Sequence, residues 1–263
     1  MSNKHFIYLL AKRYPQLVLP IAKGEKDTEE YKDLCLRLKE TTRQPEFSFD
    51  ERDKYDSVET CAGVVEVITM YQRKDFVHMA QALGNRCEPV EIPDSTGAMA
   101  LFGLNNIEKF KANEENYKDS IIILSSGYYS NVSESDVQKY CNISLSKDEW
   151  IEKSITIRKY HELTHFVMRK KYPDDVDAIR DELIADSIGI FAAFNEFNPD
   201  LLKLFLGIEN DEYREGGRLQ NYEGGSKENI PNVLKEIERI NAIYKNKKYK
   251  DVFEIYDNVK DLM

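Results

Sequence analysis

The sequence has no apolar run of the length that a membrane-spanning helix needs. Near its start, the apolar residues 6–10 are soon followed by Lys12, Arg13 and Pro15, which excludes the continuous apolar core of a signal peptide. Internal repeats and low-complexity segments are also missing. We therefore expect a globular, cytoplasmic protein that does not enter a membrane.

Cysteine is scarce, and its spacing excludes a compact cysteine-based metal site. The four cysteines lie roughly 26 to 54 residues apart and include no CxxC pair. The pattern indicates free thiols in a reducing compartment, with disulfides in an extracellular protein as the alternative. The residues concerned are Cys35, Cys61, Cys87 and Cys141.

An excess of positive charge is missing too. The chain has 37 Lys and Arg against 47 Asp and Glu, which gives a net charge of -10 and a pI near 5.1. This balance argues against a nucleic-acid binder with a broad basic surface. The hydrophobic content of 41% and charged content of 32% are those of an ordinary soluble protein. A chain of 263 residues can bury its core as one large domain or two lobes.

Histidine is also rare, with only four in the chain, yet two of them fall in the motif His161-Glu162-Leu163-Thr164-His165. On a helix, residues four apart share one face, so both imidazoles can reach one cation. Glu162, one step round the helix, is left free to act on a bound water. The spacing predicts a metal-dependent hydrolase.

A hydrolytic zinc site takes three protein ligands and keeps one position open for water, so a third ligand is needed. Glu182 is the candidate. The chain breaks at Tyr172-Pro173, between helices expected at about 147–171 and 174–197. His165 lies eight residues before Pro173 and Glu182 nine after it, so two antiparallel helices would bring both side chains to a similar height.

Other acidic residues surround Glu182. Asp186, four residues further on the same helical face, could accept the free ring N–H of a ligating histidine, although it could also be a solvated helix charge. The acidic group at the start of this helix fits capping better than calcium binding, because the EF-hand spacing is missing. Its members are Asp174, Asp175, Asp177 and Asp181.

The motif HELTH followed by Glu-x-x-x-Asp, residues 161–186, resembles the gluzincin, or thermolysin-like, zinc metallopeptidases. The resemblance implies a zincin-like fold, a Zn²⁺ cofactor and a peptide or protein substrate. It also implies that Glu162 is the general base and that Asp186 is the outer partner of a ligating histidine. The zinc ligands implied in this way are His161, His165 and Glu182.

The chain departs from that family in two respects. The interval from His165 to Glu182 is somewhat shorter than in thermolysin-like members, and no later histidine is present to help stabilise the oxyanion. A tyrosine or an arginine would have to take that place. The loop 211–225 offers Tyr222 and Arg218 between glycines, and a flexible surface connection is the alternative for this loop.

The remaining patterns predict an α+β fold that is mostly helical, with a small sheet beside the motif helix and a helical C-terminal lobe. We expect an N-terminal helical segment and linker over 1–56, an α+β lobe over 57–172, and a helical lobe with the third ligand over 173–263. Helices are expected at about 28–41, from 57 to 83 with a break near Arg73, from Pro199, at 231–245 and at 250–262. A hairpin is expected over 88–104, and a strand over 120–125, either buried or pairing with substrate.

Two alternatives to the zinc hydrolase stay open. Glu162-x-x-His165 also matches one half of a di-iron bundle site. The sequence has one candidate for the other half, Asp75-x-x-His78, and this alternative leaves His161 unexplained. His78 alone is more typical of a packed or surface histidine. The second alternative is a non-catalytic helical module that binds a partner. The sequence does not determine the oligomeric state.

Overall fold

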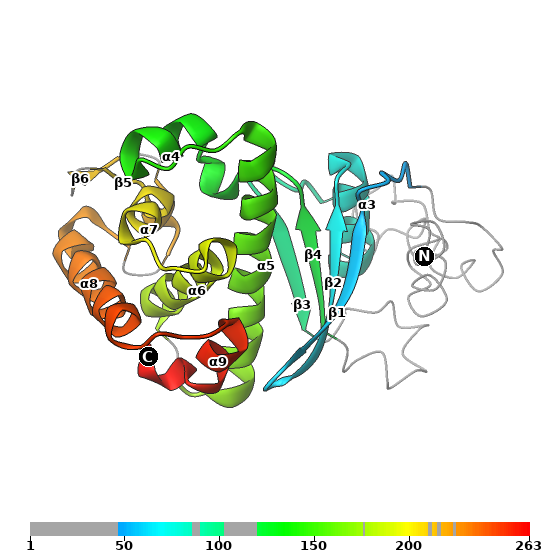
Figure 1. Ribbon diagram of the computed structural model, residues 1–263. Coiled ribbons are helices and arrows are strands. Elements are labelled where there is room, and N and C mark those ends of the chain that lie inside the picture. The colour runs from blue at the N-terminus through cyan, green and yellow to red at the C-terminus, as the bar shows by residue number, and fades with distance from the viewer. Residues whose placement is uncertain are drawn as a thin grey trace. The chain divides into compact units, whose positions relative to one another are not determined.

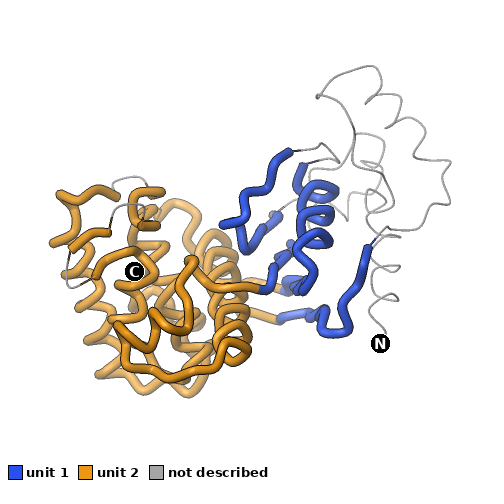
Figure 2. Tube along the Cα trace, turned by 90° about the horizontal axis from the view of Figure 1, so that it is seen from above, with its two compact units in different colours: residues 1–58, 64–126 blue, residues 59–63, 127–263 orange. Residues whose placement is uncertain are grey.

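The computed structural model describes residues 47–85, 90–102, 120–175, 177–209, 212–214, 217–222 and 225–263. The helix expected at 28–41 and most of the segment expected over 1–56 lie outside these residues. The chain divides into two compact units (Figure 2). Unit 1 takes residues up to Val58 and Val64–Ser126, and unit 2 takes Glu59–Gly63 and Gly127–Met263. The domain boundary expected at residues 172 and 173 falls inside unit 2.

Unit 1 contains a four-stranded sheet in the order β1-β2-β4-β3 and the helix α3 (Figure 1). Strand β2 runs parallel to β4, with Val67 opposite Ile122, and β3 runs antiparallel to β4, with Ala100 opposite Ile122. The bounds are β1 Lys54–Thr60, β2 Gly63–Met70, α3 Arg73–Gly84, β3 Ala98–Phe102 and β4 Ser120–Ser125.

The strand expected over 120–125 is confirmed as β4, and every one of its residues is buried. A run of apolar residues without alternation suits a strand that is covered on both faces. Because β4 has a neighbour on each side, it has no free edge with which to bind a peptide, whereas β3 lies at an edge of the sheet.

The helix expected to begin at Ser57 is wrong up to residue 70, because this stretch forms β1 and β2 instead. Its residues Val64, Val65, Val67 and Ile68 are β-branched and favour a pleated surface over a helix. Gly63, with φ +124°, allows the chain to turn between the two strands. The later part, α3, begins at Arg73 and ends at Gly84, one residue beyond the expected last residue.

The hairpin expected over 88–104 is also wrong within the described residues. Only Ala98–Phe102 forms a strand there, and it pairs with β4. Pro93 cannot donate to a ladder. The carbonyl oxygens of Pro93 and Thr96 instead accept hydrogen bonds from the guanidinium group of Arg73, both at 2.6 Å.

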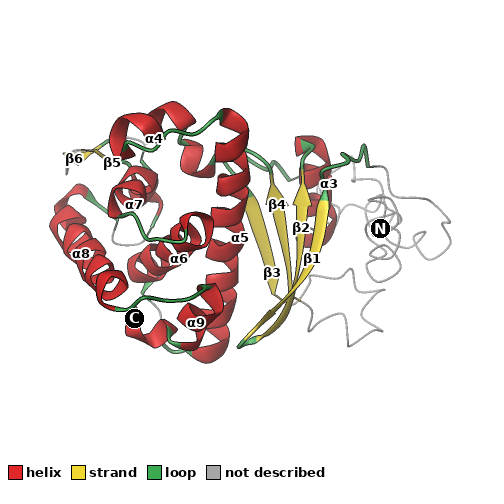
Figure 3. Ribbon diagram, viewed as in Figure 1, coloured by secondary structure: helices red, strands yellow, loops and turns green. Residues whose placement is uncertain are grey.

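Unit 2 is mostly helical (Figure 3). Helix α5 keeps the expected bounds because Ser146 and Glu149 form a capping box at its start and Tyr172-Pro173 follows its end. Asp177 caps α6, and Asn198 caps α7, which begins at Pro199 as expected. The helices are α4 Glu134–Cys141, α5 Lys147–Lys171, α6 Ala178–Phe194, α7 Pro199–Leu206, α8 Ile230–Asn246 and α9 Val252–Asp257.

Several short elements complete unit 2. A two-stranded ribbon pairs β5, Ile208–Glu209, with β6, Glu212–Tyr213. Short 3-10 helices cover Tyr129–Asn131, Arg218–Asn221, Lys227–Asn229 and Val259–Asp261. The last of these, with α9, replaces the single helix expected at 250–262.

The expected fold class is confirmed at the level of an α+β protein that is mostly helical with a small mixed sheet. No helix among the described residues has the length and apolar character needed to cross a membrane. Within unit 2, α5 and α6 pack closely. A Cβ atom added at Gly189 would lie 2.6 Å from the carbonyl oxygen of Ile157. The close approach brings the expected metal-binding residues within reach of each other.

Candidate metal centre

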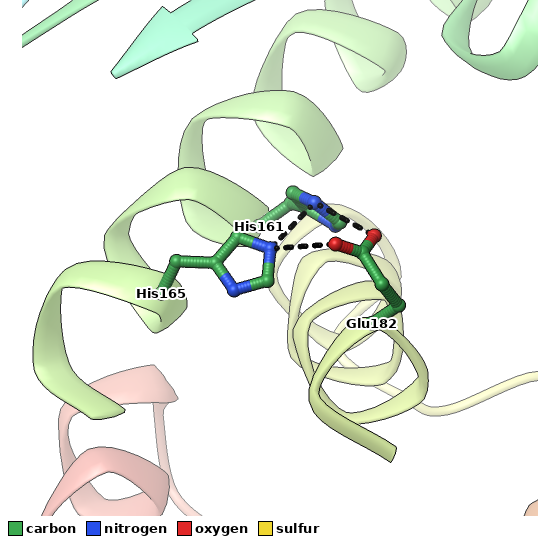
Figure 4. Close-up of side chains that lie close together, drawn as sticks. All are labelled: His161, His165 and Glu182. Atoms are coloured by element: carbon green, nitrogen blue, oxygen red, sulfur yellow. Dashed lines mark hydrogen bonds and ion pairs between the residues drawn. The ribbon is translucent and has the colours of Figure 1, made fainter. Parts of the chain in front are cut away.

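The three side chains expected to bind a metal lie together in unit 2 (Figure 4). His161 and His165 are one helical turn apart on α5, and their Nε2 atoms are 3.1 Å apart. Glu182 reaches them from α6, with carboxylate oxygens 3.5 Å from Nε2 of His161 and 3.2 Å from Nε2 of His165. Two imidazole nitrogens and a carboxylate oxygen form the donor set of several catalytic zinc sites.

The electrostatics of the cluster suit a cation. Burial would raise the pKa of the Glu182 carboxyl, but the nearby His161, His165 and Arg218 outweigh it and hold that pKa well below the usual range. Glu182 is therefore ionised across the physiological pH range, as a metal ligand would need to be. Among the described residues, His161, His165 and Glu182 are the one group of three His, Cys, Asp or Glu side chains spaced to hold a metal ion.

The ring nitrogen of His161 that points away from Glu182 hydrogen-bonds to Asp186, which is completely buried on α6. Nδ1 of His161 lies 2.7 Å from Oδ1 of Asp186. Since the carboxylate can only accept, Nδ1 carries the proton and the Nε2 lone pair is left for a metal. The position is the one that the four-residue spacing from Glu182 predicts.

Asp186 remains ionised although it is buried. Burial acts to raise the pKa of Asp186. The positive charge of Arg218 and the hydrogen bond from His161 lower it by more, so the pKa lies below its ordinary value. Arg218 forms an ion pair with Oδ2 of Asp186. Its other terminal nitrogen donates to the hydroxyl groups of Tyr129, at 3.0 Å, and Ser130, at 2.9 Å. Both terminal nitrogens of Arg218 are thus engaged behind the histidine.

Tyr222 lies beside Glu182, and the guanidinium of Arg218 lies 5.8 Å from the centroid of its ring. Its hydroxyl hydrogen-bonds to Glu182, and burial raises its pKa well above the ordinary value, so the phenol is neutral and can donate. It lines a cavity of about 220 Å³ together with His165 and Glu182. The other lining residues are Met168, Arg169, Tyr172, Pro173, Asp175, Ala178 and Asp181.

Glu162 follows His161 on α5 and is not one of the three clustered ligands. Its negative charge contributes to raising the pKa of His161, so it lies near the imidazole. The side chain is half-buried. A carboxylate beside a metal site but outside its ligand set is where a general base is needed.

A family model for a family of unknown function, DUF7005, matches the chain over residues 2–114 and 108–250. The chain belongs to this family. No curated protein and no solved structure matched the chain in the comparisons.

The residues of the di-iron alternative have other partners in this DUF7005 member. Both oxygens of Asp75 accept backbone N–H groups, from Ser48 and Phe49, at 2.9 Å. His78 packs edge-on against the ring of Phe47, with ring centroids 5.0 Å apart. Both residues belong to unit 1, and no metal-type cluster includes them in the described part of the chain.

Sequence reasoning missed Tyr129. Its hydroxyl lies 2.6 Å from Oδ1 of Asp186 and 3.0 Å from Nδ1 of His161, the residue that we expect to bind a metal through Nε2. Tyr129 precedes Asp186 by 57 residues and follows β4 in a short 3-10 helix, without any motif. No local pattern in the sequence could have identified it.

Proposed function

We propose that this protein is a zinc-dependent hydrolase that acts in the manner of a gluzincin metallopeptidase and cleaves peptide or protein substrates. The proposal is carried by one observation: the Nε2 atoms of His161 and His165 and the carboxylate of Glu182 converge, while Glu162 on the same helix stays outside that group. The donor set is the one that catalytic zinc sites use.

The chemistry follows from the residues at hand. A zinc ion held by His161, His165 and Glu182 would supply an activated water and polarise the amide carbonyl of a peptide. Glu162 accepts the proton of the attacking water and passes it to the leaving amine. Tyr222 is a neutral phenol whose one proton faces Glu182, and in the proposed mechanism it turns from that carboxylate to donate a hydrogen bond to the oxyanion as it develops.

The two expected oxyanion donors differ in their surroundings. Tyr222 lines the cavity beside the ligands. The terminal nitrogens of Arg218 hydrogen-bond to Tyr129 and Ser130 and form an ion pair with Asp186. Arg218 therefore neutralises the charge of Asp186. We therefore assign the donor role to Tyr222 and a structural, charge-balancing role to Arg218.

The test is metal analysis of the purified protein, followed by turnover of a peptide library by zinc-loaded wild type and Glu162→Gln. We expect about one zinc per chain in both proteins, chelator-sensitive cleavage by wild type, and a loss of at least ~10²-fold in Glu162→Gln, the lower range for a lost general base. Glu152→Gln, an exposed glutamate on the same helix, is the matched control.

Two results would contradict the proposal. Equal cleavage by wild type and Glu162→Gln would remove the assigned base. Stoichiometric zinc without cleavage of any peptide would favour the alternative of a zinc-stabilised module that binds a partner.

A further inference from the structure

Neither motif nor spacing in the sequence predicts Tyr129 as part of this site, and its hydroxyl is buried. It has three polar neighbours: Oδ1 of Asp186 at 2.6 Å, Nδ1 of His161 at 3.0 Å, and Nη1 of Arg218 at 3.0 Å. Arg218 can only donate and the ionised Asp186 can only accept. The phenol therefore accepts from Arg218 and donates to Asp186.

This assignment fixes the proton on His161 as well. Oδ1 of Asp186 receives both the phenol hydrogen and the Nδ1 hydrogen of His161, which lies 2.7 Å away. Two donors on one oxygen, with Arg218 on the other, determine the plane of the carboxylate. A rotation of this carboxylate would weaken the bond to His161 and release the imidazole.

The tyrosine itself is held firmly. Its backbone N–H donates to Oγ of Ser154 on α5, at 3.2 Å. Its ring packs edge-on against Phe205, with centroids 4.8 Å apart, and the guanidinium of Arg218 lies 5.2 Å from the ring centroid. The hydroxyl is thus presented to Asp186 from a fixed position that joins α5, α6 and the segment after β4.

We propose that Tyr129 is a positioning residue of the metal centre, which acts through Asp186 to hold the imidazole of His161 with Nε2 directed at the metal. This inference rests on the proposed function in one respect, that His161 binds a metal. In this role the side chain of Tyr129 contacts neither the substrate nor the metal. Its effect is on metal affinity and on the rate of metal loss.

The competing explanation is that Tyr129 only fills the core. Tyr129→Phe separates the two, because it keeps the ring and removes only the hydroxyl. Tyr256→Phe is a matched control: Tyr256 is also fully buried, and its hydroxyl contacts the same helix α5, through the carbonyl oxygen of Tyr160 and the hydroxyl of Thr164, away from Asp186.

The experiment measures the zinc dissociation constant and dissociation rate of the full chain by competition with a chromophoric chelator. Partners of metal-ligating histidines typically contribute 10- to 100-fold in metal affinity. Tyr129 contacts such a partner, Asp186. We therefore expect Tyr129→Phe to lose about 10-fold in zinc affinity and to release zinc faster. Tyr256→Phe should change neither quantity. Melting of the metal-free proteins shows whether both variants are folded.

A double-mutant cycle with Asp186→Asn gives a second, independent readout. If Tyr129 acts through Asp186, the zinc affinity of Asp186→Asn and of the double variant will agree within about 2-fold. Full additivity would overturn the inference, as would equal zinc affinity in Tyr129→Phe and Tyr256→Phe. A wild type that binds no zinc would overturn the proposed function together with it. Normal zinc binding by wild type and by Tyr129→Phe would overturn this inference alone.

Discussion

Oδ1 of Asp186 lies 2.7 Å from Nδ1 of His161, although the two residues are on different helices and 25 positions apart. The carboxylate is completely buried and its second oxygen pairs with Arg218. The bond connects a candidate metal ligand to the interior of unit 2. Changes at Asp186 should therefore affect metal binding and stability together.

Replacing Asp186 with asparagine tests this connection. The amide keeps the shape of the aspartate but loses its charge, which leaves the largely buried guanidinium of Arg218 without its counter-ion. Breaking a buried pair in this way typically costs about 3–5 kcal/mol in the free energy of unfolding. We also expect zinc affinity to fall ~10- to 100-fold. Denaturant unfolding and chelator competition measure the two effects, and Asp200→Asn, an exposed aspartate at the start of α7, should leave both unchanged.

Gly189 permits the close packing of α5 and α6. A Cβ at this position would lie 2.6 Å from the carbonyl oxygen of Ile157, which belongs to the helix backbone and cannot move aside. We expect Gly189→Ala to lower the free energy of unfolding by about 1–3 kcal/mol, because the overpacking outweighs the ~1 kcal/mol that alanine gains in helix propensity.

The same change should weaken zinc binding, because it forces apart the two helices that carry the ligands. Ala192→Ser adds one atom at a half-buried position of α6 and serves as the control. Thermal melting and zinc titration of both variants provide the comparison. A Gly189→Ala variant as stable as wild type would show that the helices can separate without cost.

The partial burial of Cys141 should protect its thiol from alkylation. Burial, and then the charge of Asp200, raise the pKa of its thiol to about 12, so at pH 8 only about one molecule in 10⁴ carries the reactive thiolate. Cys61 is exposed. N-ethylmaleimide at pH 8 should therefore modify Cys61 well before Cys141, as peptide mass spectrometry can measure. Comparable rates at both thiols would contradict the raised pKa of the half-buried Cys141.

Helix α5 and the convergence of His161, His165 and Glu182 could be predicted because their signals are local. Ser146 and Glu149 mark the start of the helix, Pro173 follows its end, and the spacing of His161 and His165 places both on one face. Glu182 then needed only the short turn between α5 and α6. Each step depends on residues within a few turns of one another.

The parts that could not be predicted depend on distant contacts. In residues 57–70, the apolar positions fit both a helical stripe and a strand, and β2 is stabilised by pairing with β4, whose residue Ile122 is opposite Val67. Tyr129 meets Asp186 only through the fold. Arg218 was expected near the metal, but its partners behind His161 could not be read from a glycine-rich loop.

The pH dependence of stability should change sign when zinc binds. Burial opposes protonation of His161, but the hydrogen bond to Asp186 and the charges of Glu182 and Asp186 outweigh it and raise its pKa above 6.5. In the metal-free protein, the folded state then binds an extra proton between pH 6.5 and that raised pKa. The resulting stability is complete below about pH 6.5 and is lost as the pH rises through the folded pKa, by up to ~1.4 kcal/mol per unit.

If zinc binds at the proposed site, we expect it to reverse the slope, because it would bind the unprotonated Nε2 and displace this proton, so that zinc affinity and the stability of the loaded protein would increase with pH. The lowered pKa of Glu182 acts only at acid pH and does not disturb this window. Urea unfolding between about pH 6 and 9, with EDTA or with zinc, measures both slopes. His161→Gln should flatten the two curves. Slopes of the same sign with and without zinc would mean that His161 does not exchange its proton for the metal.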